Sequence, residues 1–269
     1  MTLKEAMKSI KPASQALRRQ AKRRWDQVAK PLGSLGVLEE DIIRIAAASG
    51  SLAVSLHPRA IVVMCGDNGI VKEGVTQTGQ EVTAIVAGNM ARGNSCVCLM
   101  ARQAGADVIP VDVGMACRDA VPGVVNRKVA YGTKDFLEAP AMTREETVKA
   151  MEAGADMAVE LKERGYVLAG SGEMGIGNTT TSSAVASVLL DRPVEEMTGK
   201  GAGLSSEGLI HKKQIIEQAI SRYHLREADA FYTLCKVGGL DIAAMAGTCI
   251  GGMMYGIPIV LDGFISVVA

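Results

Sequence analysis

A glycine-rich stretch with a single acid, Gly170-Ser-Gly-Glu-Met-Gly-Ile-Gly-Asn-Thr-Thr-Thr-Ser182, has the composition of an anion-binding turn. Its glycines let the backbone turn tightly and approach a ligand, and Asn178 and the threonines after it can cap the helix predicted to follow. A glycine turn that ends at a helix start offers N–H groups and the positive end of the helix dipole to an anion. We therefore expect the residues of this turn to bind a phosphate: Gly175, Gly177, Asn178, Thr179 and Thr180.

The stretch does not match the common nucleotide-binding motifs. A Walker A loop requires a lysine followed by Ser or Thr, and no lysine follows Gly177. The dinucleotide fingerprint fails because Glu173 lies among the glycines, where it would face a pyrophosphate. An acid beside a phosphate loop suggests a group directed at a sugar hydroxyl or a cationic ring, so Glu173 is the candidate catalytic residue. A plain strand-to-helix turn is the alternative interpretation.

Repeated strand–helix units position this stretch. Apolar runs at 60–65, 107–113, 166–169 and 257–261 predict strands, a weaker signal lies at 124–129, and helical patterns separate them. This alternation predicts an α/β fold: a doubly wound parallel sheet, Rossmann-like and three-layered, with helices on both faces. Ligands of such sheets bind outside the carboxyl ends of the strands. The glycine-rich segments fall at those ends, so we expect them to meet at one rim.

Residues 1–50 carry no strand signal and predict a small helical segment ahead of an α/β nucleotide-binding domain at 51–269. Leu3, Ala6, Met7 and Ile10 recur at helical spacing, and a strongly basic helix is expected from Ala13 to Lys30. Nucleic-acid binding is one interpretation of this helix, but a solvated face or a subunit contact is favoured.

Composition excludes several classes of function. The 29 basic and 29 acidic side chains balance in a chain of 269 residues, which argues against nucleic acid or a membrane surface as the main partner. The six cysteines form no Cys-x-x-Cys pair and no histidine cluster accompanies them, so we expect free thiols in a reducing cytoplasm and no metal site. The amino terminus lacks the apolar core of a signal peptide, and no stretch of about 20 apolar residues predicts a membrane span.

Seven short motifs of the chain match one protein family. They come in the family's order and together span almost the whole chain. The chain resembles the nicotinate-nucleotide:dimethylbenzimidazole phosphoribosyltransferases of cobamide biosynthesis. The matching pieces are Lys30-Pro-Leu-Gly-Ser-Leu-Gly36, Gly66-Asp-Asn-Gly-Ile70 with Glu73-Gly-Val75, Gln80-Glu-Val-Thr83, Gly172-Glu-Met-Gly-Ile-Gly-Asn-Thr-Thr180, Gly201-Ala-Gly-Leu204, Gly238-Gly-Leu-Asp-Ile-Ala243 and Leu261-Asp-Gly-Phe264.

The resemblance implies transfer of phosphoribose from nicotinate mononucleotide to a lower-ligand base, benzimidazole or phenolic, with no cofactor and no metal. It implies a phosphate site made by 173–180, Gly203 and a lysine of the helix after it; by position Lys212 is chosen, with Lys213 as the alternative. It also implies a base pocket at 76–80, with Thr76 and Gln80 in its wall. A pyridinium leaves as a neutral ring without a general acid, and Glu173 could stabilise the oxocarbenium-like transition state electrostatically.

The sequence departs from the family in three places. Thr76 and Gly79 stand where serine and proline are common in the family. The resemblance also implies that the general base is a glutamate in a carboxyl-terminal segment, which this chain does not reach. We therefore expect weak activity or none from the chain alone, and a heterodimer with a longer homologous subunit, as in the two-subunit phenol-activating variant. The alternatives are a shortened form of a homodimeric enzyme and a catalytically silent nucleotide-binding or scaffolding subunit.

Overall fold

The five strands found in the described residues run parallel in one sheet. The computed structural model describes residues 7–8 and 10–269, and its strand order is β3-β2-β1-β4-β5. The strands are β1 (Arg59–Gly66), β2 (Ala106–Gly114), β3 (Val125–Asn126), β4 (Leu168–Met174) and β5 (Ile259–Leu261). The prediction of a doubly wound parallel α/β fold is confirmed.

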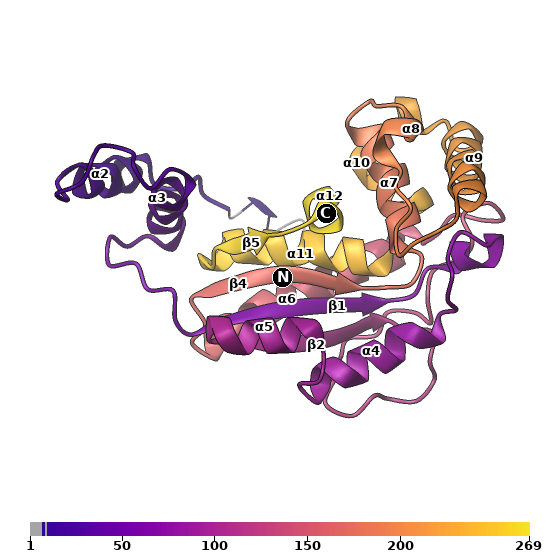
Figure 1. The fold of residues 1–269 in the computed structure, drawn as a ribbon, viewed down its shortest axis with the longest axis horizontal. Coiled ribbons are helices and arrows are strands. Elements are labelled where there is room, and N and C mark those ends of the chain that lie inside the picture. The colour runs from indigo at the N-terminus through magenta and orange to yellow at the C-terminus, as the bar shows by residue number, and fades with distance from the viewer. Residues whose placement is uncertain (1–6, 9) are drawn as a thin grey trace.

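Helices cover both faces of the sheet (Figure 1). One face carries α6 (Arg144–Glu163) and α11 (Leu240–Tyr255), and the other carries α4 (Glu81–Ala91) and α5 (Cys96–Ala104). The central strand β1 is therefore apolar on both sides: Val62 and Met64 pack in one core cluster, and Val63 and Cys65 pack in the other.

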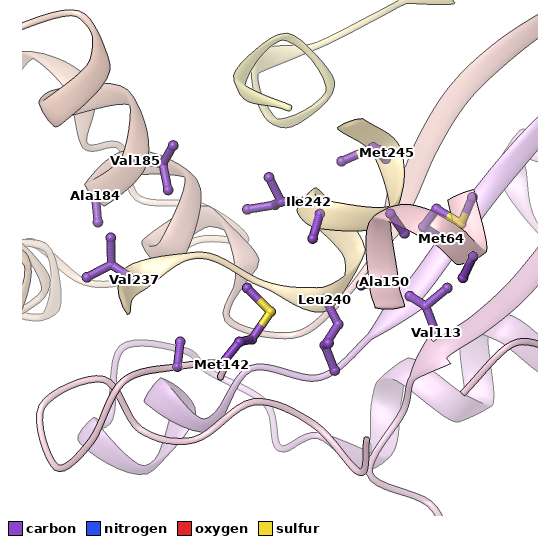
Figure 2. Packing of buried hydrophobic residues seen from close by; sticks show 14 of the residues in the cluster. Met64, Val113, Met142, Ala150, Ala184, Val185, Val237, Leu240, Ile242 and Met245 are labelled. Carbon is purple, nitrogen blue, oxygen red and sulfur yellow. The ribbon is translucent and has the colours of Figure 1, made fainter. Parts of the chain in front are cut away.

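The other helices that follow β1 in the chain gather mainly beyond the carboxyl ends of the strands (Figure 1). They are α7 (Asn178–Leu189), α8 (Val194–Met197), α9 (Ser206–Arg222), α10 (Ala230–Val237) and α12 (Phe264–Val268), with 3-10 turns η1 (Gly69–Glu73) and η2 (Leu225–Glu227). Figure 2 shows how α7 and α11 share the larger core, with Val185 of α7 near Ile242 of α11; Leu240 and Met142 belong to the same cluster. The start of α11 is thereby anchored at the rim where the predicted site lies.

Helices α6 and α11 pack with almost no space between their backbones. A Cβ added to Gly154 would overlap the backbone of Ala244, and one added to Gly247 would overlap the backbone of Met151. Because nothing larger than glycine fits at these crossings, the two helices are fixed against each other.

Two amino-terminal helices, α2 (Gln15–Asp26) and α3 (Val37–Ser49), pack mainly on each other and away from the sheet (Figure 1). Ala21, Ile43 and Ala46 form a small cluster of their own, with Trp25 beside it. The boundary at residue 50 remains a prediction. Most of the helix expected over 3–10 lies outside the described residues.

Strand β4 is longer than the apolar run predicts. The run 166–169 indicated a strand end near residue 169, but β4 continues to Met174, which pairs with Cys65 of β1. Hydrogen bonding to neighbouring strands keeps even glycines in the ladder, because a buried backbone group needs a partner. Glu173 is therefore part of a strand end, and the turn itself is only Gly175–Gly177.

Candidate active site

The turn between β4 and α7 is shaped by Gly177, which precedes the first residue of the helix. Its φ is 95°, in the left-handed region that favours glycine. A Cβ at this position would come 2.9 Å from Val71 Cγ2 and 3.1 Å from Asn68 Cβ. The turn therefore requires glycine for both its conformation and its close contact with the segment after β1.

The prediction that Asn178 and the threonines cap α7 is wrong. No side chain caps this helix; Asn178 is its first residue, and its Nδ2 donates to Glu173 Oε2 and, across 2.9 Å, to Asp241 Oδ2. Carboxyl oxygens are strong hydrogen-bond acceptors, and here those of two acids take both hydrogens of the amide. Asn178 is thus a bridge between two acids.

Several N–H groups of the turn are already engaged. Ile176 N donates to Thr83 Oγ1 across 3.1 Å, Asn178 N donates to Gly175 O, and Thr180 N donates to Gly177 O. Fewer backbone N–H groups of the turn are therefore free to bind a phosphate than the sequence indicated. The Thr180 hydroxyl, by contrast, is buried without a hydrogen-bond partner.

Lys212 of α9 reaches the same turn from the other side. Its side chain is fully buried, and Nζ donates to Thr179 Oγ1 at 2.8 Å and to Gly199 O at 3.4 Å. Within residues 7–8 and 10–269 no acid forms an ion pair with it. Burial lowers the pKa of Lys212 to about 8. A buried ammonium without a counter-charge is costly, and an anion beside Thr179 would compensate it.

The glycine-rich segment 199–204 closes over this lysine. Gly201 (φ 57°) lies so near that a Cβ there would be 2.8 Å from Thr179 Oγ1 and 3.5 Å from Lys212 Nζ. Gly203 lies farther along, and its carbonyl accepts a hydrogen bond from Gln77 Nε2. The structure therefore brings Gly201, rather than the predicted Gly203, to the lysine.

The two residues predicted for the base pocket make local hydrogen bonds in the loop after β1. Thr76 Oγ1 donates to Thr78 O at 2.9 Å, and Gln80 Nε2 donates to Asn68 O at 3.1 Å. Gln80 also lines a cavity of about 450 Å³ together with Lys72 and Tyr131. Asn68 Nδ2 in turn donates to Ile176 O at 3.4 Å, which connects this loop to the glycine turn.

A buried aspartate holds the rim together. Asp67 accepts from Thr83 Oγ1 of α4 at 2.6 Å and from Ala116 N after β2 at 2.8 Å. Because Thr83 Oγ1 also accepts from Ile176 N, one chain of hydrogen bonds joins three strand ends and α4. Burial nonetheless raises the pKa of Asp67.

Glu173 and Asp241 are both perturbed acids. Burial, followed by the charge of Glu173, raises the pKa of the fully buried Asp241 to about 7. Burial also raises the pKa of the half-buried Glu173, against the lowering effect of its hydrogen bond from Asn178. Perturbed acids at a strand end of a parallel sheet are typical of functional sites.

Sequence reasoning did not select Asp241, Gly201 or the Asp67–Thr83 pair. Asp241 carried a signal, because it follows the double glycine 238–239 in one of the matching motifs, at the start of a helix. Nothing in the local pattern connects it with Glu173, since that contact depends on the sheet.

Two general findings frame the site. No group of three or more His, Cys, Asp or Glu side chains that could hold a metal ion occurs in the part of the chain that the structure describes. In the same part, the helices are too short or too polar for any of them to cross a membrane.

Comparison with known proteins identifies the relatives of this chain. A family model described as phosphoribosyltransferase matches residues 10–269. A nicotinate-nucleotide–dimethylbenzimidazole phosphoribosyltransferase of Ruminiclostridium cellulolyticum is 46% identical over the full chain and 76% of its own length, and one of Clostridium acetobutylicum is 41% identical over 99% and 76%. A crystal structure of CobT from Thermus thermophilus superposes with a TM-score of 0.88 at 38% identity, covering 94% of this chain and 76% of that one.

Proposed function

Because this chain belongs to the nicotinate-nucleotide–dimethylbenzimidazole phosphoribosyltransferase family, we propose that it transfers phosphoribose from nicotinate mononucleotide to an aromatic base, giving an α-ribotide. The observation that carries this proposal is Lys212, buried without a paired acid and directed at Thr179 beside the glycine turn. A phosphate monoester supplies the charge and the acceptor oxygens that such a lysine and the unpartnered Thr180 hydroxyl need.

The donor nucleotide would bind with its phosphate between Lys212, Thr179 and the turn Gly175–Gly177. Its ribose would then lie toward Glu173, which comes five residues before Asn178, the first residue of α7. As the bond from C1′ to the pyridinium nitrogen breaks, its electron pair passes to the ring, and positive charge develops at C1′. A carboxylate held beside that carbon stabilises this charge.

The acceptor would enter from the loop 76–80. In this proposal Thr76 and Gln80 form the wall of the pocket that binds the acceptor, and the cavity beside Gln80 supplies space for its aromatic ring. We propose a benzimidazole or a phenol as the acceptor: its ring nitrogen or its oxygen bonds to C1′ as nicotinate leaves, and its N–H or O–H proton passes to water or to a base of the longer subunit. No cofactor enters the reaction.

For assembly, we propose a dimer with a longer homologous subunit, or otherwise with a second copy. An apolar groove of about 610 Å³ between α6, α7, α10 and α12 supports this proposal, with Met151, Leu189, Phe231 and Val268 in its lining. We propose that the assembly works in the cytoplasm, where the free thiol of the exposed Cys96 would stay reduced. Light scattering of the chain alone and with a longer homologue tests the assembly.

The function is tested by following release of nicotinate from nicotinate mononucleotide in the presence of dimethylbenzimidazole or phenol. Replacing Glu173 by Gln should lower kcat by about 10²-fold, the cost of losing one electrostatic contact to a transition state, with little change in Tm. Glu217→Gln is the matched control, because Glu217 is an exposed residue of α9. Retention of full turnover in Glu173→Gln would refute the catalytic assignment.

A further inference from the structure

The carboxylates of Glu173 and Asp241 share one amide group. Asn178 Nδ2 donates to Glu173 Oε2 and to Asp241 Oδ2. An amide nitrogen carries two hydrogens, so each carboxylate receives one of them. The two acids come from different elements, β4 and α11, and are brought together only by the fold.

The backbone around Asp241 is built to admit its carboxylate. A Cβ at Gly175 would come 2.7 Å from Asp241 Oδ2, and a Cβ at Gly239 would overlap Oδ1. Oδ1 also accepts from Ile242 N at 3.0 Å. Leu240 and Ile242, on either side of it, are anchored in the core (Figure 2). The carboxylate is therefore held in one position, with no exposure to solvent.

No side-chain cation of the described residues is paired with either acid. The titratable group that faces both acids is the thiol of Cys65 of β1, whose pKa is raised by burial and by the charges of Asp112, Asp241 and Glu173. Asp112 has its own partner, Lys128, at 3.0 Å. Two buried carboxylates without a paired cation repel each other when both are ionised, so the second of them ionises at a higher pH than an exposed carboxylate does.

We propose that Glu173 and Asp241 titrate as one pair, and that Asp241 is the positioning residue that sets the charge which Glu173 presents to the reacting ribose. The pair holds one proton at mildly acidic pH and loses it at higher pH. The doubly ionised form is the active one, because it places more negative charge beside the cationic C1′ centre. The second half of this proposal rests on the proposed phosphoribosyl transfer, and the first half does not.

The pairing is tested without substrate, by infrared titration of the protonated-carboxyl band in the wild type, Asp241→Asn and Glu173→Gln. We expect a wild-type transition near neutral pH. In each variant the remaining acid should titrate at least about one pH unit below the wild-type transition, since coupled sites interact by more than about one pKa unit. A wild-type band equal to the sum of the two single-acid titrations would overturn the pairing. If Asp241→Asn does not fold, Glu173→Gln alone decides it.

The positioning role is tested by the pH profile of kcat/KM for transfer to dimethylbenzimidazole. In Asp241→Asn the acid limb should move to lower pH by about one unit or more, and the plateau at high pH should fall. Glu39→Gln is the control: Glu39 is a mostly buried acid of α3, outside the sheet, and its loss should leave the profile unmoved. A uniform fall of activity with an unmoved limb would overturn the role and leave the pairing to the infrared result. No transfer by the wild type, both alone and together with a longer homologous subunit, would instead refute the proposed function.

Discussion

Lys212 Nζ donates to Thr179 Oγ1 across 2.8 Å and thereby joins the helix α9 to the first turn of α7. The contact brings a buried positive charge to the start of a helix, where the dipole is also positive. Because no acid is paired with this lysine among the described residues, the lysine and the helix start together define a place for an anion.

Replacing Lys212 by Met should weaken binding of nicotinate mononucleotide by about 10- to 100-fold, the range for one hydrogen bond to a charged group. Without ligand the variant should unfold at the same Tm or a higher one, because the uncompensated buried charge is gone. Isothermal titration and thermal melts measure the two effects.

Lys213→Met is the matched control for this prediction. Lys213 is the neighbouring residue, half-buried on α9. Equal losses of affinity in both variants would mean that general positive charge, and not the position of Lys212, binds the nucleotide.

Binding of the nucleotide should also weaken as pH rises past about 8, because burial lowers the pKa of Lys212 to about 8 and the ammonium is the binding form.

The stability of the ligand-free protein should change with pH in the opposite direction. Between pH 8 and the ordinary lysine pKa the unfolded chain binds more protons, so this residue makes the ligand-free protein more stable as pH rises. Melts of wild type and Lys212→Met across this window should show the difference; parallel curves would contradict the assignment of the shift.

Gly177→Ala should destabilise the protein and weaken nucleotide binding together. Its φ of 95° costs alanine about 1–2 kcal/mol, and the close contacts with Val71 and Asn68 add about 1–3 kcal/mol. Urea unfolding and nucleotide titration measure both. The control is Gly165→Ala, at φ 82° with open space around it, which should show the strain alone. Similar costs at the two sites would contradict the packing argument.

Gly247→Ala should destabilise by about 1–3 kcal/mol or more, because a methyl group must enter the backbone contact of α11 with α6. Gly170→Ala is the control, since a Cβ there would be 3.5 Å from Ile61 Cγ1, an ordinary contact. Chemical denaturation compares them. If Gly247→Ala were as stable as Gly170→Ala, the helices could separate more easily than their packing indicates.

Patterns within one element were predictive. The run 60–65 predicts a strand because it is apolar throughout, and the structure has β1 there, buried on both faces. This signal depends only on residues that are neighbours along the chain. The same holds for the order of strands and helices, from which the parallel sheet follows.

Contacts between elements were not predictable in the same way. The glycines of 170–174 suggested a loop, but pairing with β1 extends the strand to Met174. Asn178 was expected to cap a helix, and it instead bridges Glu173 to an acid 63 residues farther along the chain. The roles of Thr76, Gln80 and Gly203 remain predictions, since their hydrogen bonds in the structure are local or reach only Gln77.

The glycine contact between α6 and α11 has a consequence for how ligands come and go. Because the two helices cannot slide past each other, the wall that carries Asp241 is rigid. On the opposite side of the site, an exposed hydrogen bond from Gln77 to the carbonyl of Gly203 joins the loops 76–80 and 199–204. We therefore expect entry and release to depend on the loops 76–80 and 199–204, and the rate at which they separate to set an upper limit on turnover.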